Sequence, residues 1–236
     1  MKRTTSIAIV AGIVLVLLAG LFALQRDTAP TPARDVTTGE GGNMQADIRI
    51  VAFGDSLTAG FGLPLAESYP AVLERTLRER GHSVEVVNAG VSGETTAGAR
   101  ERAQFIRDRL NADIVLLGIG GNDALRSLPI SDARANITHI LTTLTSGEDA
   151  PRVLLLQIQA PQNAGVAYKE AFDALYPDLA REFDIPLVPF VVVEVVRNQA
   201  FMLPDGIHPN SAGYEFLVRE HIAPAVEALL PARDSI

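Results

Sequence analysis

Short apolar runs alternate with longer amphipathic segments along most of this chain, and that alternation restricts its possible folds more than any other feature. Five runs have the length of strands, at residues 48–53, 84–88, 114–119, 153–158 and 185–188. Apolar residues recur at helical spacing in the segments that separate or follow them, at residues 69–77, 95–110, 137–144, 168–183 and 211–230. Repeated strand–helix–strand units predict an α/β fold in which helices cover both faces of a five-stranded parallel sheet.

The composition fits one folded domain with an appendage. Of the 236 residues, 47% are hydrophobic and 20% are charged, which is enough apolar material for a core and too much for a disordered chain. The chain has a net charge of −8, whereas proteins that bind nucleic acids usually carry an excess of basic residues, so no nucleic-acid partner is expected. The absence of cysteine excludes disulfides, thiolate metal sites and a thiol nucleophile.

The N-terminal segment predicts export. Lys2 and Arg3 precede an uncharged apolar stretch, residues 6–24, which as a helix spans about 28 Å, close to the ~30 Å hydrocarbon core of a bilayer. Residues 1–24 fit either an uncleaved transmembrane anchor or a cleaved secretory signal. The length of the stretch, and the bulky Leu21 before the best small-residue site at Ala23, favour the anchor.

Either reading places the rest of the chain outside the cytoplasm, because the positive residues stay inside. The domain is then anchored in the inner membrane facing the periplasm, or secreted to the periplasm if the segment is cleaved. Residues 25–46 are rich in Thr, Pro, Gly and Asp without apolar periodicity, which predicts a flexible linker. The expected organisation is therefore an anchor or signal (1–24), a linker (25–46) and one folded domain (47–236).

A serine and a histidine at opposite ends of this domain suit nucleophilic catalysis. Ser56 follows the first apolar run in Gly54-Asp55-Ser56-Leu57, and His208 lies in Asp205-Gly206-Ile207-His208-Pro209. A serine attacks a carbonyl only with a base within hydrogen-bond reach, and a histidine oriented by a carboxylate supplies one. We therefore expect Ser56 as nucleophile, His208 as general base and Asp205 as the orienting carboxylate. Taken alone, Ser56 could simply cap a helix.

The three other histidines suit the role of the base less well. His82 sits beside Gly81 in a predicted turn, and His139 and His221 lie in predicted amphipathic helices, where a structural or solvated role is the usual one. His208 lies in a short loop instead. Asp205 can bind one of its ring nitrogens there while the other nitrogen faces the serine.

Two further blocks can supply donors for an oxyanion. Gly93 lies in Val91-Ser92-Gly93-Glu94-Thr95, and Asn122 lies in Gly120-Gly121-Asn122-Asp123. With the Ser56 N–H, the Gly93 N–H and the Asn122 amide would bind the negative charge of a tetrahedral intermediate. All three follow predicted strands, whose carboxyl ends border the binding crevice of a parallel sheet. Gly93 could equally be a turn residue and Asn122 a helix cap, whereas Asp123 suits a supporting role.

These blocks resemble the pattern of the SGNH hydrolases, also called the GDSL esterase/lipase family. The family's nucleophile serine corresponds to Ser56, and the glycine of its N-x-x-x-x-G block corresponds to Gly93, with Asn88 as the asparagine. Its GxND asparagine corresponds to Asn122, and its D-x-x-H pair corresponds to Asp205 and His208. The resemblance covers roughly residues 47–230. Further stretches, such as 121–126, 176–187 and 205–210, are similar to the bacterial thioesterase I/lysophospholipase/arylesterase branch.

The resemblance implies a three-layer α/β/α flavodoxin-like sandwich and hydrolysis of carboxylic esters or thioesters, lysophospholipids included, without a cofactor or metal. Loops 124–129 and 159–168, which follow the third and fourth predicted strands, are expected to border the acyl pocket. A metal-dependent phosphoesterase is the alternative, because late Asp-x-x-His and Gly-Asn-Asp motifs also occur in two-metal sites. Such sites use several histidines. A non-catalytic binding module would need the Ser, Asn and His blocks to coincide by chance.

Overall fold

Five parallel strands form the centre of the computed structural model, which describes residues 46–231. They are β1 (Ile48–Gly54), β2 (Val84–Gly90), β3 (Ile114–Gly118), β4 (Arg152–Gln157) and β5 (Leu187–Pro189). Their order in the sheet is β2-β1-β3-β4-β5. The predicted α/β fold with a five-stranded parallel sheet is confirmed, with strand ends shifted by one or two residues.

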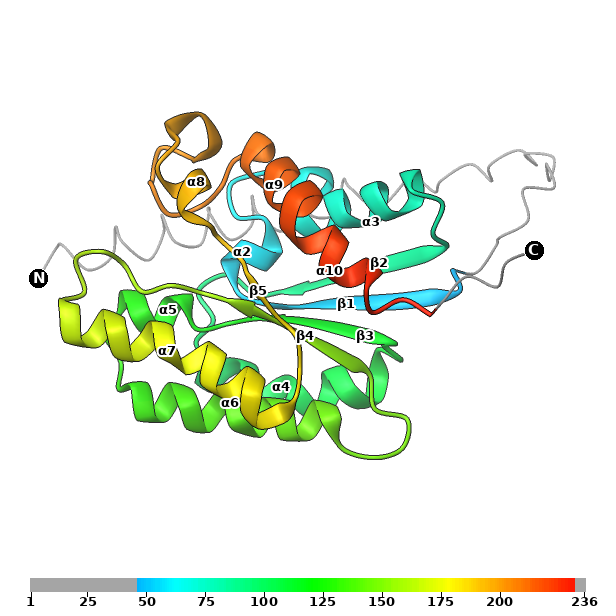
Figure 1. Cartoon of the computed structure of the whole chain (residues 1–236), viewed down its shortest axis with the longest axis horizontal. Coiled ribbons are helices and arrows are strands. Elements are labelled where there is room, and N and C mark those ends of the chain that lie inside the picture. Colours follow the sequence, from blue (N-terminus) through cyan, green and yellow to red (C-terminus); the bar gives the residue numbers. More distant parts are fainter. Residues whose placement is uncertain (1–45, 232–236) are drawn as a thin grey trace, which may run out of the picture. The chain divides into compact units, whose positions relative to one another are not determined.

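Helices cover both faces of this sheet (Figure 1). The α-helices are α2 (Ser56–Ala59), α3 (Tyr69–Glu79), α4 (Thr96–Arg109), α5 (Gly121–Leu125), α6 (Ile130–Thr145), α7 (Val166–Phe183), α8 (Val193–Val196), α9 (Ser211–Leu217) and α10 (Ala223–Glu227). Figure 1 shows α3, α9 and α10 over one face and α4, α6 and α7 over the other. The central strands are therefore buried on both sides, which is why they are continuous apolar runs rather than alternating ones.

The predicted anchor or signal segment (1–24) and nearly all of the predicted linker (25–46) lie outside the described residues. Over residues 46–231, no helix combines the length and apolar character that crossing a bilayer requires.

Glycines at the ends of three neighbouring strands place the start of α2 at the carboxyl edge of the sheet. Gly54 at the end of β1 is in register with Gly90 of β2 and with Gly118 of β3. A Cβ at Gly54 would lie 2.2 Å from the Gly118 carbonyl oxygen, and one at Gly90 would lie 2.2 Å from the Ala59 nitrogen. Only glycine permits this close approach, so α2 folds directly against the strand ends.

The predicted C-terminal helix over residues 211–230 is interrupted. α9 passes into a π-helical segment, η3 (Val218–Ile222), and then into α10, with the Ala223 N–H bonded to the Val218 carbonyl five residues back. Pro224 explains the change. It has no N–H to donate to the carbonyl four residues earlier, and its ring would collide with that carbonyl, so the backbone widens before it.

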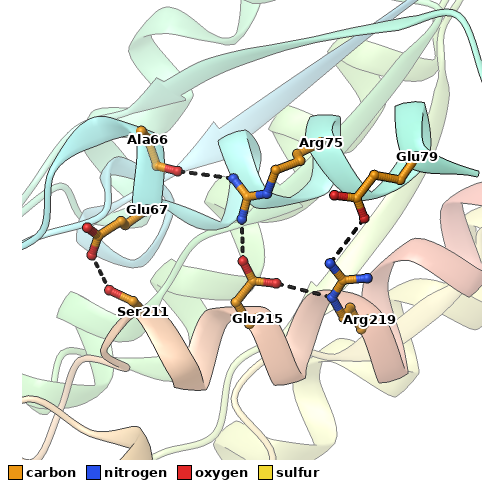
Figure 2. Close-up of polar contacts among 7 residues, drawn as sticks. All are labelled: Ala66, Glu67, Arg75, Glu79, Ser211, Glu215 and Arg219. Carbon is orange, nitrogen blue, oxygen red and sulfur yellow. Dashed lines mark hydrogen bonds and ion pairs between the residues drawn. The ribbon is translucent and has the colours of Figure 1, made fainter.

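Ion pairs join α3 to the helix that follows the His208 loop. Figure 2 shows Arg75 between the Ala66 carbonyl and Glu215, and Arg219 between Glu215 and Glu79. The Arg219 contacts measure 3.1 Å to Glu79 and 3.2 Å to Glu215, and these side chains are more than a third exposed. Each pair therefore stabilises the fold little. Together they link α3 to α9 and to the π-helical segment η3 that continues it.

One further contact in this region lies close to His208. The Ser211 hydroxyl donates a hydrogen bond to Glu67, on the short 3₁₀ turn η1 (Leu65–Glu67) that precedes α3 (Figure 2). Ser211 is the first residue of α9 and stands three positions after His208. The contact therefore anchors the end of the histidine loop.

Candidate active site

The structure brings Ser56 and His208 into contact although 152 residues separate them in sequence. The Ser56 Oγ lies 2.8 Å from His208 Nε2, and His208 Nδ1 lies 2.7 Å from Asp205 Oδ2. The serine hydroxyl, the imidazole and the carboxylate thus form one continuous hydrogen-bonded line. In this arrangement the imidazole can accept the serine proton while the carboxylate stabilises the resulting cation.

The turn that presents Ser56 is built by Asp55. Asp55 is the N-cap of α2, and its Oδ1 accepts a 3.0 Å hydrogen bond from the Leu57 N–H. Ser56 is the first helical residue, so the alternative reading of Ser56 as the cap is wrong. The Gly121 N–H, at the start of α5, also bonds the Asp55 carboxylate. Asp55 therefore ties the serine turn to the helix that carries Asn122.

The Asp55 carboxylate is almost completely buried, at 1% exposure. Burial raises its pKa from the usual 3.8 to about 6, and the hydrogen bond from Leu57, the charge of His208 and the bond from Gly121 only partly offset this. Burying a carboxylate costs free energy, and the hydrogen bonds from the N–H groups of Leu57 and Gly121 offset part of that cost.

The Asp205 carboxylate stabilises the loop that carries His208. Asp205 Oδ1 accepts the backbone N–H groups of Ile207 at 2.9 Å and His208 at 3.0 Å, while Oδ2 faces the ring. Partial burial alone would raise the pKa of Asp205, but the backbone and ring bonds from His208 and the bond from Ile207 outweigh it and hold the pKa below its usual value. Asp205 therefore stays ionised. The Phe61 ring covers the imidazole at a centroid distance of 4.6 Å.

The Gly93 and Asn122 blocks follow β2 and β3, at the same edge of the sheet as Ser56. Gly93 has φ +82°, and nothing lies within 4 Å of the position that a Cβ would occupy there. Asn122 lies in the first turn of α5 and is half-buried. The N-cap of α5 is Gly120, without a side-chain cap bond, so the reading of Asn122 as that helix's cap is wrong.

Two arginines hold the Gly93 loop. Arg102 binds both carboxylate oxygens of Glu94, at 2.7 and 2.6 Å, and donates to the Gly54 carbonyl at 3.1 Å. Its guanidinium also lies 4.4 Å from the centre of the Phe53 ring. Arg126 donates to the Gly93 carbonyl at 3.0 Å. The loop is thereby tied both to the strand that leads into Ser56 and to the end of α5.

Asp123 has the supporting role that its position suggests. It is buried, and it accepts the Thr96 N–H at 2.8 Å and the Thr96 hydroxyl at 2.6 Å. This joins the start of α4 to α5. Within residues 46–231, no three His, Cys, Asp or Glu side chains group in a way that could hold a metal ion.

A cavity of about 350 Å³ lies beside Ser56 and the histidine loop. Loops 124–129 and 159–168, expected to border an acyl pocket, contribute Leu125 and residues 159–162. Leu57, Gly121 and Ile158 form another part of the wall, and they follow Ser56, precede Asn122 and follow β4, respectively. The rest of the wall comes from residues on or beside α8 and from the histidine loop: Val191, Val193, Val196, Arg197, Gly206 and Ile207. Its lining is mainly apolar, as for a site that takes a hydrocarbon chain.

Sequence reasoning missed three contributors to this region. Asp55 is visible in the motif, but its link to Gly121 depends on the meeting of two loops. The sequence indicates the Glu94–Arg102 ion pair only weakly, because opposite charges eight residues apart are common in any segment that contains a helix. The α8 wall of the cavity follows the shortest strand, where neither an apolar periodicity nor a motif marked a site.

Comparison with known proteins identifies the family to which this chain belongs. The model of the GDSL-like Lipase/Acylhydrolase family matches residues 52–216. The chain is 36% identical, over 71% of its length and 78% of the relative's, to thioesterase 1/protease 1/lysophospholipase L1 of Escherichia coli K12. It is 33% identical to an arylesterase of Vibrio mimicus, over 70% of this chain and 82% of that one. The crystal structure of TesA superposes with a TM-score of 0.72 at 33% identity, covering 77% of this chain and 99% of TesA.

The matched region holds the whole Ser56–His208–Asp205 line, and the family resemblance read from the sequence is confirmed. The chain therefore belongs to the GDSL-like lipase/acylhydrolase family, the SGNH hydrolases, and is a serine-esterase-type carboxylic ester hydrolase.

Proposed function

We propose that Ser56, His208 and Asp205 are the catalytic triad of this esterase. The observation that carries the proposal is the 2.8 Å contact between Ser56 Oγ and His208 Nε2, with Asp205 on the opposite ring nitrogen at 2.7 Å. His208 takes the Ser56 proton as the hydroxyl oxygen attacks the acyl carbon. Asp205 holds the ring and stabilises the imidazolium.

Collapse of the tetrahedral intermediate completes the first half of the reaction. The bond from the acyl carbon to the leaving oxygen or sulfur breaks, and His208 protonates the alcohol or thiol that departs. Water then attacks the acyl-enzyme with His208 again as base, which releases the acid and restores Ser56. We assign the oxyanion to the N–H groups of Ser56 and Gly93 and the amide of Asn122, which all lie at the carboxyl edge of β1, β2 and β3.

The substrates we propose are small-molecule acyl esters and thioesters, lysophospholipids among them. Two observations support this range: the mainly apolar cavity beside Ser56, and relatives whose names include arylesterase, thioesterase and lysophospholipase. A membrane-anchored enzyme facing the periplasm would meet lysophospholipids directly, and the apolar stretch at 6–24 supports such an anchor. If the segment is instead cleaved, the mature form begins between residues 24 and 34 and is recovered in the periplasm.

Ser56→Ala and His208→Ala test the triad. Each is expected to abolish hydrolysis of nitrophenyl esters while the far-UV circular dichroism and melting temperature stay near those of the wild type, because the triad acts as a unit. His139→Ala is the matched control and should keep full activity. A fluorophosphonate should label Ser56 in the wild type and in His139→Ala, and it should not label the Ser56→Ala variant. Loss of activity with a chelator, restored by a divalent metal, would favour the phosphoesterase instead.

A further inference from the structure

The cavity beside Ser56 contains one cationic side chain. Among the described residues that line it, Arg197 alone is charged, and the others are apolar, glycine or glutamine residues. No carboxylate lines the cavity, although the chain as a whole carries a net charge of −8. Arg197 is therefore the one full charge that the lining residues present to a molecule in the cavity.

The guanidinium of Arg197 has no partner within residues 46–231. Arg197 and Arg109 are the two arginines of that range whose side chains make no hydrogen bond or ion pair, whereas the side chains of Arg102 and Arg126 near the site are each bound to carboxylate or carbonyl oxygens. Glu194, three residues earlier on α8, forms no ion pair with Arg197 either. Binding an anion would therefore break no contact that Arg197 makes inside this domain.

The backbone at Arg197 is fixed even though its side chain is exposed. Arg197 is the C-cap of α8, and its N–H donates to the Val193 carbonyl at 3.0 Å. The next residue, Asn198, donates to the Val195 carbonyl at 3.1 Å, and its side chain caps the following turn through the Ala200 N–H. The point from which the guanidinium extends is thus pre-organised, which lowers the cost of ordering it around a ligand.

We propose that Arg197 binds an anionic oxygen group, a carboxylate or a phosphate, carried by the ester substrate. The inference rests on the proposed esterase function and narrows its substrate class. Apolar side chains such as Leu125, Val193 and Ile207 contact the hydrocarbon part, and the planar guanidinium pairs with two oxygens of the anion. The anion stands either at the far end of the acyl chain, as a carboxylate, or on the leaving alcohol, as a phosphate.

Two matched substrate pairs distinguish these sources. The first pair is the nitrophenyl monoester of adipic acid and nitrophenyl hexanoate, which differ by a carboxylate on the acyl side. The second is lysophosphatidic acid and the monoacylglycerol with the same acyl chain, which differ by a phosphate on the leaving side. The enzymes compared are the full-length wild type, Arg197→Gln, Arg197→Lys and, as the control, Arg109→Gln, which removes the other arginine without a partner.

Arg197→Gln is expected to lower kcat/KM for the anionic member of one pair by ~10-fold, the size of one charge-assisted contact, while kcat/KM for its neutral partner is unchanged. Arg197→Lys should keep part of the preference and Arg109→Gln all of it. An effect in the adipate pair puts the anion on the acyl chain, and an effect in the phosphate pair puts it on the leaving group. Equal loss for anionic and neutral members, or no loss in either pair, overturns the inference.

Failure of the proposed function would look different. In that case the wild type would hydrolyse none of the four substrates, and the assignment of Arg197 would fall with the esterase. If Arg197→Gln hydrolyses the neutral substrates at the wild-type rate and the ratio of kcat/KM between anionic and neutral substrates is unchanged, only the assignment of Arg197 as the anion site is overturned.

Discussion

The phenolic oxygen of Tyr214 donates a 2.8 Å hydrogen bond to the carbonyl oxygen of Leu57, and both residues are buried. Leu57 follows the proposed nucleophile directly, and Tyr214 lies on α9, the helix that begins just after the His208 loop. One bond therefore connects the two segments that carry Ser56 and His208. Their 2.8 Å contact depends on how these segments are held together.

Tyr214→Phe tests this connection. Removing the hydroxyl leaves the Leu57 carbonyl buried without its partner, which should lower the free energy of unfolding by about 1–3 kcal/mol. Because the serine turn is then less well placed against His208, kcat should also fall while KM changes little. Both are measured well below the melting temperature of the variant. A stability loss with wild-type kcat would show that the bond serves the fold alone.

Asp55→Asn tests the buried carboxylate through the pH dependence of stability. Because the pKa of Asp55 is raised from 3.8 to about 6, the folded state binds this proton more tightly than the unfolded state. The contribution of Asp55 to stability is therefore greatest below pH ~4 and declines as the pH rises toward ~6. The amide variant cannot ionise and should lack this decline.

The measurement is the difference in unfolding free energy between wild type and Asp55→Asn, from urea melts at pH 4, 5, 6 and 7. Between the two ends of the window it should move by ~3 kcal/mol in favour of the variant. Comparing the two proteins at each pH cancels the other titrating groups. A difference that stays constant over this range would contradict the raised pKa.

How much of the site was predictable follows from where each residue lies in the chain. Ser56, Gly93 and Asn122 come just after strands, and parallel strands all end at one edge, so their placement at that edge follows from periodicity and strand direction. Asp205 and His208 are three residues apart, so their contact is local. The sheet order β2-β1-β3-β4-β5, by contrast, does not follow from the apolar pattern; it is the order of the flavodoxin-like fold that the family resemblance implies.

The rest depends on contacts between segments that are distant in sequence. Tyr214 on Leu57 and Asp55 on Gly121 are tertiary pairs, and nothing in the spacing of these residues indicates them. The break before Pro224 was visible in principle, because a proline in the interior of a predicted helix removes a hydrogen bond. What the sequence does not indicate is that the backbone answers with a π-helical turn rather than a kink.

Arg102→Gln tests the support of the Gly93 loop. Losing the guanidinium leaves Glu94, whose side chain is 8% exposed, without its partner and releases the Gly54 carbonyl. The loop should then shift and displace the Gly93 N–H that we propose as an oxyanion donor, so kcat should fall by ~10-fold or more with a small change in KM.

The matched control is Arg107→Gln, on the same helix, whose guanidinium donates to the Ser146 carbonyl away from the site. Its kcat should equal that of the wild type. Glu94→Gln should reproduce the effect of Arg102→Gln, and the double variant should lose less than the sum of the two, because both remove one interaction. Full additivity would show that the pair does not act as a unit.

Substitutions at Asn122 distinguish most directly between a role as oxyanion donor and a purely structural role, because the proposed role needs the amide N–H₂ and not only a side chain of this size. Asn122→Ala should lower kcat by ~10²–10³-fold with little change in KM, as for other single oxyanion donors. Since Gly120 is the N-cap of α5, the melting temperature should change little. Asn122→Asp puts a carboxylate beside the developing negative charge, so it should be at least as inactive as the alanine variant, with partial recovery at low pH where the acid can donate. An active aspartate variant would remove Asn122 from the oxyanion site and leave the N–H groups of Ser56 and Gly93 as its donors.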